Sequence, residues 1–292
     1  MNVEGKIRAE EIAGIFQEVC RKRPLIHMLP NAVSASLCAD GLSALGARPL
    51  MAVAACEMEE ITRQADASVI NLGQPDSEKL RAAELVIKEA AGNAKPLVLD
   101  PVGCGASRFR LESVQRILNM PWQGIVKGNR SELYSIQNDC LTMEGVDAIA
   151  NWELSEQIPA DRVYLATGKD DLILWAGNSM EIAHREGRSP EKTSRYNIVG
   201  SGCLTGAVAG ACYAAVLRTH SGLEKISDER ILTRLRVTAA LAASLGMAFG
   251  LERANAVSGY GMAKAALLDG LTLLAEPEFE DWIRKGERRW ME

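Results

Sequence analysis

Short apolar runs of strand length alternate with longer stretches of helical periodicity through the first two thirds of the sequence. Apolar residues recur at helical spacing in residues 77–91 and 108–118. The predicted strands lie before, between and after these helices, at residues 24–29, 67–72, 95–100, 122–127 and 162–167. This alternation predicts an α/β fold, with a mainly parallel central sheet that helices cover on both faces.

Two features distinguish the rest of the sequence. The segments "DLILWAG" and "SMEIAH" follow the last of these strands and predict an antiparallel pair. Residues 202–274 then predict three consecutive alanine-rich helices. The longest apolar run, residues 237–251, is shorter than a membrane span and is flanked by charged residues, which favours a buried helix. No repeat or Ser/Pro-rich linker interrupts the chain, so we expect residues 1–292 to form one domain.

Composition narrows the class of protein. The 292 residues are 47% hydrophobic and 24% charged, as in soluble globular proteins, and the net charge of −5 argues against nucleic-acid binding. The polar N-terminus of mixed charge does not resemble a secretory signal. Seven cysteines lack the spacing of a zinc site, and an odd number does not suit a disulfide framework. We therefore expect a cytoplasmic protein that binds neither membranes nor nucleic acid.

Ligands of open α/β sheets bind beyond the carboxyl ends of the strands, so the candidate chemistry lies in the segments after each strand. Asp100 ends a predicted strand and precedes the glycine-rich turn "PVGCG". It could bind Mg²⁺ together with phosphates and waters, or cap the turn through its carboxylate. After the next strand, Asn129 and Glu132 have the spacing of a capping box, while Lys127 could meet a phosphate. Asp100 and Glu132 together are a candidate magnesium site.

The segment "NIVGSGCLTGAVAGA" places Gly200, Gly202 and Cys203 at the start of a helix of small residues. The unpaired N–H groups of a helix start attract anions, although glycines at a tight turn can also serve only to relieve backbone strain. In "ATGKDD", Thr167 and the following glycine suit either a phosphate contact or a simple β-turn. Both aspartates of that segment are expected to be turn and solvent residues.

Near the N-terminus, Asn31 could cap a helix or hold a polar ligand atom. His27 is expected to be a core histidine, and Met51 either lines an apolar pocket or packs in the core. The Walker motif, the dinucleotide-binding glycine fingerprint and the GxSxG nucleophile motif are absent from the sequence. The sequence therefore does not predict a P-loop, a Rossmann fold or a serine hydrolase.

Five motifs in order, "LGARPLM", "LDPVGCGASRFR", "KGNRSEL", "ATGKDDLI" and "NIVGSGCLTGAV", together resemble the hydroxyethylthiazole kinase family, which has the ribokinase-like fold. The resemblance spans residues 24–215. It implies transfer of a phosphoryl group from ATP, with Mg²⁺, to the primary hydroxyl of 4-methyl-5-(2-hydroxyethyl)thiazole in thiamine salvage. It also implies a homotrimer whose substrate site is shared between neighbouring subunits.

The resemblance gives each candidate residue a role. Cys203 stands where most ribokinase-like enzymes have an aspartate base, facing the attacking hydroxyl, and a helix N-terminus favours the thiolate form. Asp100 and Glu132 match the family's magnesium and phosphate carboxylates. Lys127 replaces a common arginine, which keeps the charge but loses the bidentate fork. The resemblance implies ATP contacts for Lys127, Thr167 and Gly200, and thiazole contacts for Met51, Gly202 and Asn31.

Three segments depart from the family's usual sequence, namely "PNAV" at residues 30–33, "NLGQPD" at 71–76 and "AVSGYGM" at 256–262. The charged segment 184–195 could be a lid or a solvated hairpin. One alternative is therefore a ribokinase-like kinase for another small heterocyclic alcohol. A second is an NAD(P)H-hydrate dehydratase, against which Cys203 argues. A third is a non-catalytic paralogue that binds a thiamine-related ligand, against which the intact Asp100 and Glu132 argue.

Overall fold

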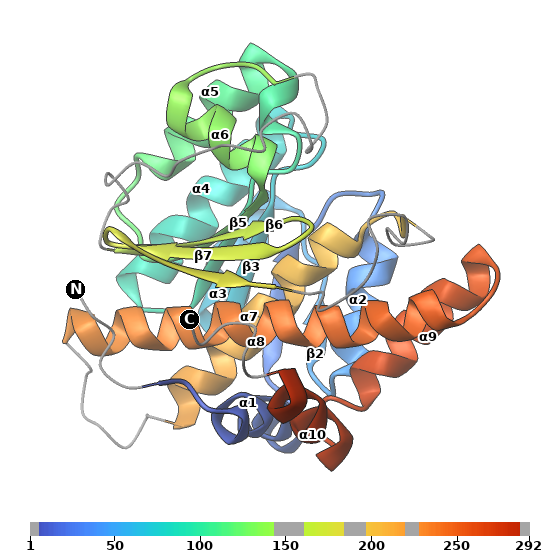
Figure 1. The fold of residues 1–292 in the computed structure, drawn as a ribbon. Helices are drawn as coiled ribbons and strands as arrows, with labels where there is room; N and C mark the ends of the chain where they lie inside the picture. The colour runs from blue at the N-terminus through green and yellow to red at the C-terminus, as the bar shows by residue number, and fades with distance from the viewer. Residues whose placement is uncertain (1–5, 143–160, 184–196, 220–227, 287–292) are drawn as a thin grey trace.

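The computed structural model describes residues 6–142, 161–183, 197–219 and 228–286 (Figure 1). Within these residues one eight-stranded sheet has the order β2-β1-β3-β4-β5-β6-β7-β8. Its parallel strands are β1 (Leu25–Leu29), β2 (Arg48–Leu50), β3 (Ala67–Asn71), β4 (Leu97–Asp100), β5 (Gly124–Asn129) and β6 (Arg162–Thr167). The antiparallel extension consists of β7 (Asp171–Trp175) and β8 (Asn178–Ile182). The predicted mainly parallel sheet and its antiparallel pair are confirmed.

The strand that the sequence did not predict is β2, at one edge of the sheet. It has three residues, and Arg48 lies opposite Leu25 of β1. A strand this short shows neither an apolar run nor alternation of apolar and polar residues. The edge position also suits Pro49, because a proline without an N–H group would break the ladder of a central strand.

The helices agree with the predicted segments. α4 (Ser77–Gly92) follows the N-cap Asp76, and α5 (Arg108–Leu118) follows the N-cap Ser107. The three predicted late helices are α7 (Ser201–Thr219), α8 (Glu229–Ala256) and α9 (Tyr260–Thr272). The other α-helices of the described residues are α1 (Ala9–Lys22), α2 (Ala35–Ala44), α3 (Met58–Gln64), α6 (Arg130–Asn138) and α10 (Pro277–Gly286).

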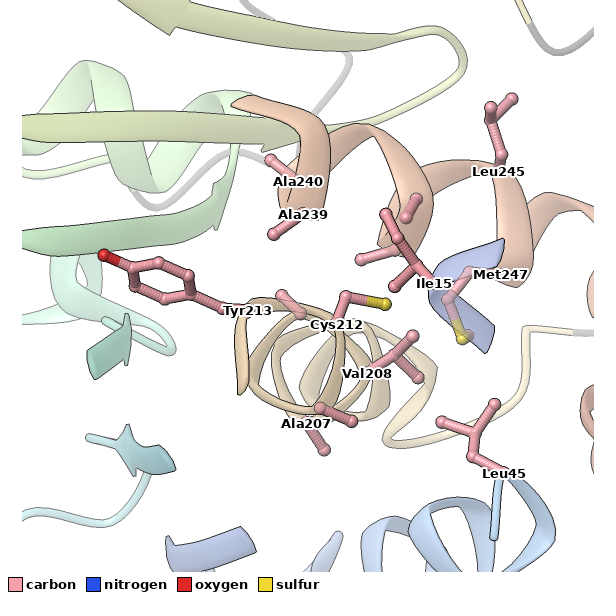
Figure 2. Packing of buried hydrophobic residues seen from close by; sticks show 14 of the residues in the cluster. Ile15, Leu45, Ala207, Val208, Cys212, Tyr213, Ala239, Ala240, Leu245 and Met247 are labelled. Atoms are coloured by element: carbon pink, nitrogen blue, oxygen red, sulfur yellow. The ribbon is translucent and has the colours of Figure 1, made fainter. Parts of the chain in front are cut away.

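Helices cover both faces of the sheet, as Figure 1 shows. Buried side chains of α1, α2, α7 and α8 form one apolar cluster, and those of α3, α4 and α5 contribute to a second. Figure 2 shows α7 inside the first cluster, with Val208 and Cys212 near side chains such as Ile15 and Met247. Small residues let α7 approach the sheet closely, since a Cβ at Gly210 would lie only 2.5 Å from Val69 Cγ2.

Two helices, α7 and α8, are long and apolar enough to cross a membrane by length and composition alone. In each of them, 78% of the apolar window is buried inside the protein. The two helices therefore serve as core helices, as the sequence predicted for residues 237–251.

His27 lies in the core between two strands and a loop. Its Nδ1 is 3.3 Å from Ser68 Oγ, and its Nε2 is 3.4 Å from the carbonyl oxygen of Ala52. Burial lowers the pKa of His27 to about 4, so the ring is neutral at physiological pH. The prediction of a satisfied core histidine is confirmed.

Candidate active site

The carboxyl ends of the parallel strands meet at one edge of the sheet, and the candidate residues gather there. Asn71 at the end of β3 lies beside Asp100 at the end of β4. Asn129 at the end of β5 lies beside Thr167 at the end of β6. The register of the sheet thus brings together side chains from four separate strand ends, as expected for an open α/β sheet.

A buried ion pair occupies the middle of this edge. Lys127 Nζ lies 3.5 Å from Asp100 Oδ1, and the two side chains are only 4% and 1% exposed. Burial raises the pKa of the Asp100 carboxyl, an effect that Lys127 opposes and the charge of Glu132 increases. Burial also disfavours the Lys127 ammonium, but the attraction of the nearby carboxylates outweighs it and raises the pKa of Lys127. The ammonium form of Lys127 is therefore favoured, which places a positive charge beside Asp100.

One oxygen of the Asp100 carboxylate is available for a ligand. Asp100 Oδ1 is buried and has no hydrogen-bond partner among the described residues. The Lys127 ammonium neutralises this oxygen only from 3.5 Å, so the oxygen keeps lone pairs with which it could bind a cation. The described part of the chain contains no group of three or more His, Cys, Asp or Glu residues that could hold a metal ion. A cation at Asp100 would therefore need phosphate or water ligands as well, which is how Mg²⁺ commonly binds.

Asn71 is a site residue that sequence reasoning missed. It is fully buried, and its Nδ2 donates to Asp100 Oδ2 at 2.9 Å. Its Oδ1 accepts from Asn31 Nδ2 at 2.8 Å and from the N–H of Gly73 at 3.0 Å. The signal in the sequence was a polar residue at the end of the apolar run "ASVIN", shortly before a glycine turn. Asn71 thereby connects the carboxylate to the first loop of the chain.

Asn31 links Asn71 to Cys203 through hydrogen bonds. Its Nδ2 donates to Cys203 Sγ at 3.4 Å as well as to Asn71. Its Oδ1 accepts from the N–H groups of Val33 and Ser34 at 2.9 and 3.1 Å, just before α2. Asn31 Oδ1 therefore caps the turn before α2, whose N-cap residue is Ser34, and a ligand contact by Asn31 stays a prediction.

The first residues of α7 pack closely against the ion pair of Asp100 and Lys127. A Cβ at Gly202 would lie 3.2 Å from Lys127 Nζ, and one at Gly206 would lie 3.6 Å from Asp100 Oδ2. Gly200 has a φ of 90°, in the left-handed region that favours glycine. Cys203, 9% exposed, belongs to the first turn of this helix, whose N–H groups include some that no helical carbonyl accepts.

The amide of Ser201 is not one of the free groups at this helix start, because it donates to the carbonyl oxygen of Ile198 at 3.1 Å. The unpaired N–H groups that the sequence predicts at this helix start therefore do not include the one of Ser201. The turn that begins α7 thus reduces the set of candidate donors to those of the neighbouring residues.

Glu132 is fixed by backbone N–H groups through both oxygens. Its Oε2 accepts from Asn129 N–H at 2.8 Å, and Asn129 Oδ1 accepts in return from Glu132 N–H at 2.8 Å, which completes the predicted capping box. Its Oε1 accepts from Gly103 N–H at 2.7 Å, in the turn after Asp100. Glu132 thus joins the start of α6 to the glycine-rich turn, and a further ligand would use its remaining lone pairs.

Thr167 lies at the end of β6, where its hydroxyl donates to the carbonyl oxygen of Gly128 at 3.3 Å. The turn after it differs from the prediction in one residue, since Asp171 is buried and not solvent-exposed. Asp171 Oδ1 accepts from Gly168 N–H at 3.0 Å, and Oδ2 accepts from the Ser244 hydroxyl at 2.7 Å. The expectation of a solvent residue was wrong because a hydroxyl of the distant helix α8 satisfies this carboxylate.

Met51 follows β2, is partly buried and packs against the first apolar cluster. That position agrees with core packing, and its side chain is not wholly enclosed. The charged segment 184–195, expected to be a lid or a hairpin, lies outside the described residues.

The mainly parallel sheet, with a glycine-rich helix start above a buried lysine and carboxylate, defines a kinase of the ribokinase-like class. Residues 16–250 match the family model described as the hydroxyethylthiazole kinase family. The chain belongs to this family.

Individual relatives agree with the family match. The hydroxyethylthiazole kinase of Shouchella clausii (strain KSM-K16) is 36% identical over 203 residues, which cover 68% of this chain and 75% of the relative. The hydroxyethylthiazole kinase of Desulfovibrio desulfuricans (strain ATCC 27774 / DSM 6949 / MB) is 30% identical over 271 residues, which cover 90% of this chain and 93% of the relative. The structure of the hydroxyethylthiazole kinase protein from Pyrococcus horikoshii OT3 matches with a TM-score of 0.72 at 28% identity, covering 94% of this chain and 95% of that one.

Proposed function

We propose that the protein transfers the γ-phosphoryl group of ATP to the primary hydroxyl of 4-methyl-5-(2-hydroxyethyl)thiazole, a step of thiamine salvage. The observation that carries this proposal is the position of the first turn of α7 above the buried pair of Asp100 and Lys127. Phosphoryl transfer asks the protein mainly for positioning and for stabilisation of negative charge. The relatives' names support the thiazole alcohol as the acceptor.

Cys203 is the proposed catalytic residue. In the transfer, a bond forms between the acceptor oxygen and the γ-phosphorus, the bond to the β-phosphate oxygen breaks, and ADP leaves. The hydroxyl proton passes to Cys203 Sγ, which acts as the general base. Asn31 Nδ2 donates to this sulfur, and such a donor stabilises negative charge there. A general base of this kind contributes roughly 10²–10⁴-fold to the rate.

Asp100 and Glu132 are the proposed residues for Mg²⁺, which would bind together with ATP phosphates and waters and neutralise phosphate charge. Asp100 Oδ1 supports this assignment, because it makes no hydrogen bond among the described residues and pairs with Lys127 Nζ only at 3.5 Å. Lys127, Thr167 and Gly200 are the proposed ATP contacts. Met51, Gly202 and Asn31 are the proposed thiazole contacts.

We further propose one kinase domain over residues 1–292 that assembles as a homotrimer in the cytoplasm and acts on small molecules, with neither nucleic acid nor membrane as a partner. Exposed apolar side chains near the site support the assembly. Val33 is 64% exposed and Val199 is 60% exposed. The two residues belong to the loops that meet where a Cβ at Gly200 would lie 3.0 Å from Ser34 Cβ. A neighbouring subunit would cover such side chains.

Product identification tests the function. The purified protein is incubated with ATP, Mg²⁺ and an equimolar mixture of the thiazole alcohol and other small heterocyclic alcohols, and the products are separated by mass spectrometry. The proposal expects the thiazole monophosphate as the main product. A phosphate ester of another alcohol would identify a different acceptor for the same site. If the ATP stayed intact and no phosphate ester formed, the kinase proposal itself would be contradicted.

A further inference from the structure

A lysine of α4 bridges the loop that contains Asn31, a proposed thiazole contact, and the loop after β3. Lys79 lies in the first turn of α4 and is partly buried. Its Nζ donates to the carbonyl oxygens of Pro30 at 2.7 Å and Gly73 at 2.6 Å. Pro30 follows β1 and Gly73 follows β3, and these strands are neighbours in the sheet. One ammonium group therefore joins the loops that leave two adjacent strands.

A second hydrogen bond joins the same two loops. Gln74 Oε1 accepts from the N–H of Ala32 at 3.1 Å. Gln74 has a φ of 54°, a left-handed conformation that residues other than glycine seldom adopt. The bridged loops are the segments "PNAV" and "NLGQPD", whose sequences depart from the family's usual ones. Lys79 and Gln74 thus make three hydrogen bonds that hold the two loops together.

The bridged loops support the residue that contacts the cysteine. Asn31 directly follows Pro30, and a Cβ at Gly73 would lie 3.0 Å from Asn31 Cβ and from its Nδ2. Asn31 Nδ2 donates in turn to Cys203 Sγ. A shift of either loop would therefore move the amide away from the thiol.

We propose that Lys79 is a positioning residue for the acceptor alcohol, locking residues 30–33 to residues 71–76 and so fixing Asn31 against Cys203. The lock is a property of the fold, and only the identity of the acceptor rests on the proposed function. Hydrogen bonds from a charged donor are roughly twice as strong as neutral ones, and here one group makes two of them. Burial lowers the pKa of Lys79 to about 8, against the attraction of Asp76 and Cys203 and with the repulsion of Arg110, so the ammonium form prevails at neutral pH.

Steady-state kinetics test this role with Lys79→Met and with Lys88→Met, a matched change at an exposed lysine of the same helix. Loss of two partly buried hydrogen bonds should raise the KM for the acceptor about tenfold in Lys79→Met. The KM for ATP should change less than about twofold, and Lys88→Met should match the wild type in both constants. An unchanged acceptor KM in Lys79→Met, or an equal rise in both KM values, would overturn the proposal.

Amide hydrogen exchange separates the lock from the choice of acceptor. In Lys79→Met, exchange should quicken at residues 31–33 and 73–74 and stay unchanged in β4. If exchange quickens only in these loops and the wild type does not phosphorylate the thiazole, Lys79 does hold the loops together. Only the thiazole as the acceptor is then rejected. Unchanged loops, or faster exchange throughout the sheet, would reject the lock.

Discussion

The ammonium of Lys127 and the carboxylate of Asp100 are 3.5 Å apart in the interior of the protein, on the neighbouring strands β5 and β4. Both charges lose their hydration at this depth, and only their mutual attraction and additional hydrogen bonds offset that loss. Asn71 supplies one such bond to the carboxylate. The two charges therefore depend on each other for their place in the fold.

Removing one member of the pair should be more costly than removing both. We expect Lys127→Met to lower the free energy of unfolding by about 3–5 kcal/mol, because it leaves a buried carboxylate unpaired. The double variant with Asp100→Asn should be more stable than the sum of the two single losses predicts. Urea unfolding of the wild type and the three variants measures this coupling. Strictly additive losses would show that the pair is not coupled.

Two glycines of α7 should respond in opposite ways to alanine. A Cβ at Gly210 would lie 2.5 Å from Val69 Cγ2, so Gly210→Ala should destabilise the protein by about 1–3 kcal/mol through overpacking. A Cβ at Gly206 would meet nothing closer than 3.6 Å, and alanine there should stabilise the helix by about 0.5–1 kcal/mol. Thermal unfolding of both variants checks the order, and equal midpoints would refute the close approach of α7 to the sheet.

Asp171, the first residue of β7, should contribute to ATP binding by anchoring the turn after Thr167. Asp171→Ala removes the acceptor for Gly168 N–H and for the Ser244 hydroxyl, so the turn after Thr167 loses its anchor. We expect the KM for ATP to rise about tenfold, which corresponds to about 1.4 kcal/mol. Ser244→Ala removes one of the two bonds and should raise it by less. If ATP kinetics were unaffected in Asp171→Ala, the turn would not contribute to nucleotide binding.

His27 should make the fold sensitive to mild acid. Its pKa is about 4 in the folded protein, against the ordinary histidine pKa of 6.5 that an unfolded chain retains. Between these values the unfolded chain binds a proton that the folded protein does not, so stability falls as the pH falls from 6.5 towards 4. The full loss is about 3 kcal/mol. Urea unfolding across this range should show the loss in the wild type and a smaller slope in His27→Gln. Parallel curves would mean that His27 does not titrate in this way.

The strands of the sheet could be predicted because their apolar runs carry the information locally. Residues 95–100 and 162–167, for example, became β4 and β6 with little change in bounds. The short β2 could not be predicted, because its three residues become a strand only through pairing with β1. Asp100 and Cys203 could be predicted as site residues, because Asp100 ends an apolar run before a glycine-rich turn and Cys203 follows the glycines at a helix start.

The remaining site residues depend on distances that the sequence does not contain. Asn71 acquires its role from the register that sets it beside Asp100. Asp171 is buried because Ser244, 73 residues later, supplies a hydroxyl. Lys79 reaches across the loop from Gly73 to Pro30, which precedes it by 49 residues. Each of these partners comes from a different element, and only the packing of the fold brings them together.

The most direct test of the central claim is ADP release measured with and without the thiazole alcohol, in the wild type and in Asp100→Asn. The substitution keeps the size of the side chain and an oxygen for the Asn71 bond, but it removes the charge that Mg²⁺ would need. We predict release that depends on both the thiazole and Mg²⁺ in the wild type, and release lowered at least about 100-fold in the folded variant. Thiazole-dependent release at the same rate in both proteins would contradict the assignment of phosphoryl transfer to this site.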